Sequence, residues 1–184
     1  IGANTTLDYG LNLAVEYGDA DDFAEVLYFG ASYTTESDVL IDFHQYFADY
    51  GNAHTNTAIQ NQDSRLSNLA VQFPLTPTLK MTASYQLVGG DGGYSYGWGG
   101  EDDNYLLTWN AVQYSDFNRL DEESFQLRLD YTTPIPGLRG MIRHVEGEFK
   151  SGGADQDHNE TNIDIRYAVQ SLDGLNLRAR YARV

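Results

Sequence analysis

The chain has 184 residues, of which 41% are apolar, and no apolar run approaches the ~20 residues that a membrane-spanning helix needs. Its 27 acidic residues outnumber 11 Lys and Arg, and the formal net charge of -16 argues against nucleic acid, because phosphate requires a basic surface. The absence of cysteine excludes disulfide bonds and cysteine metal sites.

The first part of the chain alternates apolar and polar residues, which is typical of β-strands whose two faces differ. This alternation predicts a strand over residues 5–17, a second through Leu27 and Tyr33, and a third through Ile41 and Phe43. Polar or turn-forming stretches between them predict the connections. These connections are 18–23, 35–37 and 51–63.

The middle of the chain continues the pattern and then interrupts it. One strand with Leu69 and Phe73 on its apolar face is expected to end at Pro74, because proline cannot donate to a strand ladder. Another strand covers 79–87. Residues 89–122 begin with a glycine-rich stretch and alternate poorly, so they predict one long loop.

Four further strands are expected in the last third of the chain. Their apolar and polar residues alternate over 125–131, 138–144, 162–170 and 175–184. A turn at 133–137, a loop at 150–158 and a turn at 172–174 separate them. The sequence therefore predicts an all-β chain of about nine antiparallel strands.

The lengths of the connections alternate between short and long along the whole chain. Short turns at one end and longer loops at the other are typical of a transmembrane β-barrel with external loops. In lipid every backbone polar group needs a partner, so such a sheet has to close. We therefore expect residues 1–184 to form one partial β-barrel domain, whose first and last strands pair with sequence outside this chain.

Basic residues are unevenly distributed. Residues 1–64 contain no Lys or Arg, whereas arginines are concentrated in the last third, which suggests a local electrostatic field. Strand alternation places several arginines on the polar face, opposite the apolar rows. They are Arg128, Arg143, Arg166, Arg178 and Arg180.

Five segments between about 80 and 184 form a recognisable series, with a characteristic order and spacing. They read NAVQYSDFN, SFQLRLDY, PIPGLRGMIRH, ETNIDIRYAVQS and GLNLRARYARV. In these segments the sequence resembles the OprD-type family of substrate-specific outer-membrane porins. The resemblance implies a barrel of eighteen strands, of which this chain would supply the second half without the last strand.

The resemblance also implies a location and a function. It implies a channel in the bacterial outer membrane for passive uptake of small carboxylate-bearing solutes, with no cofactor and no enzymatic activity. Residues 89–122 would be an external loop folded into the lumen. The five arginines named above would form a basic ladder, opposed by Tyr114 and Asp116. Expected partners are these solutes, outer-membrane lipid and lipopolysaccharide, and the remaining half of the barrel, and a weak homotrimer is an open alternative.

Other interpretations of the same residues remain open at this stage. The lumen arginines could be structural, each paired across strands with Asp130 or Asp164. The barrel could be a structural or adhesive protein without specific transport, and a soluble β-sandwich would also give short alternating strands. Acidic residues in the loops could bind a divalent cation, although their spacing is not that of a calcium loop. They are Asp19, Asp21, Asp22, Asp102 and Asp103.

Overall fold

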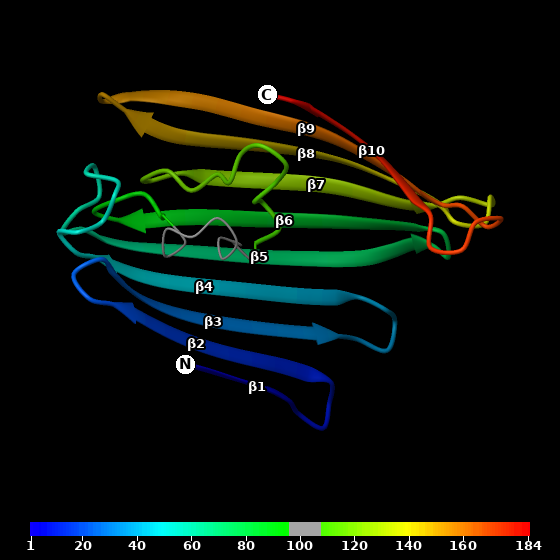
Figure 1. The fold of residues 1–184 in the computed structure, drawn as a ribbon, viewed down its shortest axis with the longest axis horizontal. Helices are drawn as coiled ribbons and strands as arrows, with labels where there is room; N and C mark the ends of the chain where they lie inside the picture. The colour runs from blue at the N-terminus through cyan, green and yellow to red at the C-terminus, as the bar shows by residue number, and fades with distance from the viewer. Residues whose placement is uncertain (96–107) are drawn as a thin grey trace.

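The computed structural model describes residues 1–95 and 108–184. The described residues form one antiparallel sheet, in which every strand pairs with its neighbour in sequence, from β1 to β10 (Figure 1). No helix in these residues has the length and apolarity needed to cross a bilayer. The strands are β1 (Gly2–Thr6), β2 (Leu11–Ala20), β3 (Ala24–Thr34), β4 (Leu40–Tyr50), β5 (Asp63–Thr76), β6 (Leu79–Gly90), β7 (Glu123–Thr132), β8 (Leu138–Ser151), β9 (Ala154–Ala168) and β10 (Asn176–Arg183).

The all-β antiparallel architecture confirms the expectation from sequence, but the prediction of one continuous strand over 5–17 was wrong, because this range belongs to two strands, β1 and β2. The chain instead turns back on itself between β1 and β2, where Leu7 N donates to Leu11 O at 2.8 Å and Gly10 N to Leu7 O at 2.9 Å. Gly10 has a φ of 77°, a conformation that glycine adopts without strain. Apolar and polar residues happen to alternate through this turn, so their period does not reveal it.

Two of the expected long loops are also tight hairpins. The connection between β2 and β3 is residues 21–23, with Asp22 at a φ of 54°, and that between β8 and β9 is Gly152–Gly153, at 60° and 81°. The polar residues expected in loops at 18–23 and 150–158 largely extend the strands instead. At this end of the sheet, only the connections 51–62 and 91–122 are long.

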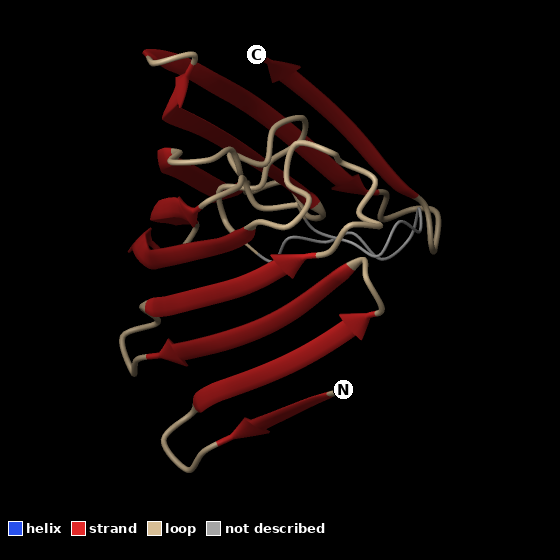
Figure 2. Ribbon diagram, turned by 90° about the vertical axis from the view of Figure 1, so that its left-hand side faces the viewer, coloured by secondary structure: helices blue, strands red, loops and turns tan. Residues whose placement is uncertain are grey.

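The sheet is strongly curved, and the long connections lie on its concave side (Figure 2). The two faces differ as the alternation predicts. Convex-face apolar side chains such as Leu69, Leu127 and Ile142 are 46–47% exposed, because none of residues 1–95 and 108–184 covers them. On the concave face, Asn68, Thr82 and Gln126 are buried beneath the long connections.

A cluster of tyrosines closes the concave face near the long connections. The rings of Tyr28 and Tyr46 are tilted by 37° with their centroids 4.7 Å apart, and Tyr46 also contacts Tyr94, at 5.3 Å. Tyr50 Oη donates to Ser95 O at 2.8 Å and accepts from Ser95 N at 2.7 Å. Burial raises the pKa of Tyr94, so its phenol stays neutral and packs as an apolar ring. This cluster holds the start of the 91–122 connection against β3 and β4.

Candidate functional site

The pairing register of β7–β10 brings the basic residues of the concave face together. Arg128 on β7 lies opposite Arg143 on β8, and Arg166 on β9 lies opposite Arg178 on β10. Arg180 is the register partner of Asp164 on β9. The five arginines singled out from the sequence therefore share one wall of neighbouring strands.

Ion pairs neutralise part of this wall. Arg128 makes a two-point contact with Asp130, with Nε and Nη2 each 2.7 Å from a carboxylate oxygen. Asp164 accepts from Arg166 Nε at 3.1 Å and from Arg178 Nε at 2.9 Å, and is also bonded by Arg178 Nη2. Asp130 and Asp164 are therefore ionic partners of the arginines, but only the contact of Arg178 with Asp164 crosses strands, as the structural interpretation above expected; Arg128 and Arg166 pair within their own strands.

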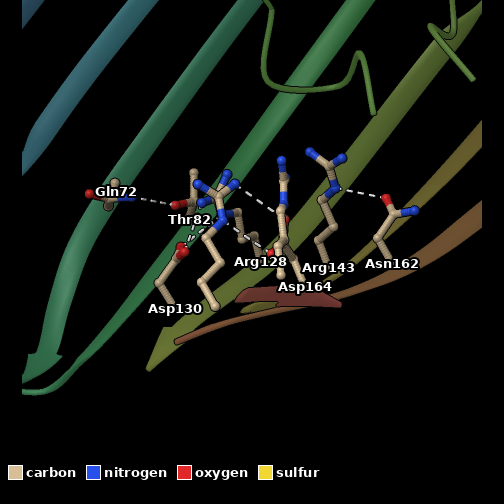
Figure 3. A network of polar contacts seen from close by, with 9 residues as sticks. Gln72, Thr82, Arg128, Asp130, Arg143, Asn162 and Asp164 are labelled. Carbon is tan, nitrogen blue, oxygen red and sulfur yellow. Dashed lines mark hydrogen bonds and ion pairs between the residues drawn. The ribbon is translucent and has the colours of Figure 1, made fainter. Parts of the chain in front are cut away.

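Two other guanidiniums of the wall have no carboxylate partner among residues 1–95 and 108–184. Arg143 Nε donates to the Asn162 amide oxygen at 2.7 Å, a neutral acceptor (Figure 3). Arg180 makes no hydrogen bond or ion pair with the described residues. The wall thus combines arginines in ion pairs with arginines that have no carboxylate partner in the described part of the chain.

Arg139 belongs to the same wall, although the sequence did not single it out. It is the register partner of Arg166, and it lines two adjoining cavities of about 370 and 580 Å³. Lys80, Arg128 and Arg166 line the first cavity with it. Its position, an even number of residues from Arg143 on the same strand, is the signal that could have identified it.

Residues 108–122 lie on the concave face and are attached to it by buried polar contacts. Asn110 is fully buried, and its amide oxygen accepts from Ser84 Oγ at 2.5 Å and from Asn68 Nδ2 at 3.2 Å. Its amide nitrogen donates to Ser124 Oγ at 2.8 Å. One side chain therefore ties this segment to β5, β6 and β7.

Trp109 connects the two sides of the concave face. Its indole Nε1 donates to Asp42 Oδ2 on β4 at 2.8 Å, and the Arg128 guanidinium lies 5.6 Å from the centre of its ring. Asp42 Oδ2 is also 3.1 Å from His44 Nε2, and His44 Nδ1 is 2.8 Å from Tyr28 Oη. The segment is thereby fixed between an acidic group on β4 and a basic group on β7.

The two residues expected to oppose the arginines lie further along the same segment. The Tyr114 side chain is 79% exposed, and its amide donates to Glu160 Oε1 on β9 at 3.0 Å. Asp116 is half-buried, and its carbonyl accepts from Gln86 Nε2 on β6 at 2.9 Å. Sequence reasoning missed Glu160 and Asn110, which hold this segment in place.

The acidic residues considered for a divalent cation do not form a site in the described structure. No three His, Cys, Asp or Glu side chains within residues 1–95 and 108–184 are grouped so as to hold a metal ion. Asp19, Asp21 and Asp22 belong to this part of the chain, whereas Asp102 and Asp103 lie outside the described residues.

A curved antiparallel sheet with an apolar convex face and a charged concave face defines a chain of the outer-membrane porin class. Residues 1–184 match the family described as outer membrane porin, OprD family, and the chain belongs to this family. Its relatives are porins, which are channels rather than enzymes. It is accordingly a bacterial outer-membrane β-barrel protein, as the resemblance of the second half implied.

Three similar proteins, all from Pseudomonas aeruginosa, show how much of a porin the chain covers. Porin D is 29% identical over 213 residues, which cover 99% of this chain and 47% of Porin D. The crystal structure of OprD superposes with a TM-score of 0.83 at 26% identity, covering 98% of this chain and 52% of that one. That of OccK3 (OpdO) has a TM-score of 0.83 at 26% identity, with 99% and 50% covered. The chain spans about half the length of these relatives, and the sheet is part of a barrel.

Proposed function

We propose that the barrel containing this chain is a channel for small carboxylate-bearing solutes, such as amino acids or organic acids, which pass along the arginine wall of β7–β10. The observation that carries this proposal is the row of guanidiniums on the concave face, where Arg128, Arg139, Arg166 and Arg178 line open cavities. Arg139 and Arg180 make no ion pair within the described part of the chain, and Arg143 contacts only a neutral amide oxygen on β9.

Conduction requires sites that bind strongly enough to attract a solute and weakly enough to release it. A guanidinium that stays in contact with water contributes at most about 1 kcal/mol to such a contact. Neighbouring strands lie about 4.8 Å apart, so a carboxylate can pass from one guanidinium to the next without a deep well. The wall therefore supports stepwise passage.

The 91–122 connection is proposed to be an external loop folded into the lumen, where it narrows the pore opposite the arginines. Asn110 and Trp109 attach the loop to β4–β7, and the backbone at Tyr114 attaches it to β9. Tyr114 and Asp116 would then face the amine end of a zwitterionic solute while arginines bind its carboxylate.

The test is replacement of Arg178 and Arg180 together by Gln in the intact barrel. We expect the flux of carboxylate solutes to fall about threefold or more, because two contacts of up to about 1 kcal/mol each are lost. Ion selectivity should shift toward cations. Liposome swelling and reversal potentials measure the two effects.

The matched control is the double variant Lys150→Gln, Arg183→Gln, which removes the same charge from the convex face. Both residues are exposed, and the alternation along β8 and β10 turns them away from the lumen. Unchanged solute flux and selectivity in the Arg178, Arg180 variant would contradict the channel proposal and favour a structural or adhesive barrel.

A further inference from the structure

Glu160 on β9 is a fully buried carboxylate whose charge the arginine wall does not contact directly. Its relative exposure is 0%, and its register partner on β8 is the equally buried Val145. A carboxylate removed from water is costly unless its oxygens accept several hydrogen bonds. The partners of Glu160 therefore indicate what its burial achieves.

Two of these partners are consecutive backbone amides of the 91–122 connection. Tyr114 N donates to Oε1 at 3.0 Å, and Ser115 N donates to Oε2 at 2.7 Å. Each carboxylate oxygen holds one amide, so the contact fixes both the position and the orientation of this backbone. Charge-assisted hydrogen bonds of this kind are stronger than those between neutral groups.

The third partner leads from Glu160 to the arginine wall. Asn162 Nδ2 donates to Glu160 Oε1 at 2.6 Å. Asn162 Oδ1 accepts from Arg143 Nε at 2.7 Å, a contact visible in Figure 3. Because its amide nitrogen is engaged by Glu160, Asn162 presents its oxygen to Arg143. The orientation of the guanidinium thus depends on a residue that also holds the loop.

We propose that Glu160 and Asn162 are positioning residues that couple the loop segment at 114–116 to the Arg143 guanidinium and so fix the width and the charge of the constriction together. Glu160 holds the loop, and Asn162 transmits the geometry to Arg143. The effect on solute selectivity rests on the proposed channel function, whereas the holding of the loop does not.

The first test is Glu160→Gln in the intact barrel, recorded in planar bilayers in plain potassium chloride. The glutamine side chain has only one acceptor oxygen. Its NH2 group would replace the other oxygen and face a backbone N–H or the Asn162 amide, so two donors would meet without an acceptor between them. Loss of a charged hydrogen bond should raise the population of displaced loop about tenfold, seen as added closing events in the open-channel current. Glu148→Gln, the same change at an exposed convex-face residue of β8, should add no closing events to the current.

A second variant removes the contact from the loop side and leaves the strand intact. Ser115→Pro removes the N–H that donates to Glu160 Oε2, so it should give closing events like those of Glu160→Gln. Gln113→Pro is its control, because the amide of Gln113 makes no hydrogen bond to the described residues. Heat-modifiable migration in detergent gels verifies that each variant assembles. The absence of added closing events in both Glu160→Gln and Ser115→Pro would overturn the proposal.

The coupling to Arg143 is tested with Asn162→Leu, which removes the contacts of Asn162 with Arg143 and with Glu160 Oε1 and leaves the two backbone amides as donors to Glu160. This variant should change the ratio of anion to cation permeability without adding closing events to the open-channel current. Glu160→Gln added to it should then raise the closing events without a further change of the ratio. An additional change of the ratio would show that Glu160 does not act through Asn162.

The two proposals can fail separately. If the Arg178, Arg180 variant left solute flux unchanged while Glu160→Gln still produced closing events, the channel proposal would be contradicted. The proposal that Glu160 holds the loop would still be supported.

Discussion

Asp164 lies between two guanidiniums of the wall. Its relative exposure is 5%, whereas the side chains of Arg166 and Arg178 that contact it are 44% and 42% exposed. The buried anion holds both cations toward the cavity without removing them from water. In the proposed channel, Asp164 would therefore compete with a solute carboxylate for these two arginines and keep the binding of the solute shallow.

Asp164→Asn should therefore strengthen the binding of carboxylate solutes. With the internal competitor gone, we expect their apparent affinity to rise about threefold to fivefold, equivalent to no more than about 1 kcal/mol. Block of single-channel current by a slowly passing dicarboxylate measures this affinity. Asp130→Asn, which releases only Arg128, should have a smaller effect, and weaker block in Asp164→Asn would contradict the competition.

At the scale of the strands, the two faces of the sheet were predictable because side chains alternate with a period of two. Where each strand ends was less predictable. Asp8 and Gly10 mark a turn by their chemistry, yet the apolar residues continue in phase across it. Likewise, the polar residues before and after Gly152–Gly153 read as a loop, although they extend β8 and β9.

The same alternation gives the face of each arginine but not its ionic partner. Asp164 binds Arg166 from two positions earlier on β9 and Arg178 from the neighbouring strand. The second contact depends on the register of β9 and β10, which the sequence does not specify. Glu160 was missed because the polar run before it was taken for a loop, which hid its alternation with Asn162.

The convex face of the strands should be sensitive to charge at the centre of its apolar band. Ile142 is 47% exposed and lies between Leu129 and Ile163 in register. Ile142→Arg should destabilise the barrel by roughly 2–4 kcal/mol if it lies near the bilayer midplane. Unfolding in urea from lipid vesicles measures the cost.

Met141→Arg is the control for this prediction, because it introduces the same side chain one position away. Met141 faces the opposite way and lines the 370 Å³ cavity on the concave face. We expect it to cost far less than Ile142→Arg. Equal destabilisation by the two variants would mean that the convex face of β8 does not contact lipid.

At the scale of the whole chain, the basic residues are confined to one side of the sheet. Residues 1–62, which form β1–β4 and the connection after them, contain no Lys or Arg, whereas the wall of arginines occupies β7–β10. The 108–122 segment lies between them and contacts Asp42 on one side and Glu160 on the other. In the proposed channel, this uneven distribution would orient a zwitterionic solute with its carboxylate toward the arginines.

Asp116→Asn should weaken the passage of amine-bearing solutes selectively. If Asp116 opposes the arginine wall as proposed, removing its negative charge takes away an attraction for the ammonium group, and we expect the flux of a basic amino acid to fall about threefold. A dicarboxylate of similar size should pass at least as fast, because the carboxylate that repels it is gone. Liposome swelling with the two solutes in parallel measures the ratio of fluxes, and Asp157→Asn on the convex face of β9 controls for the loss of one charge. Equal reductions for both solutes would indicate that Asp116 affects the pore only through the shape of the loop and not through its charge.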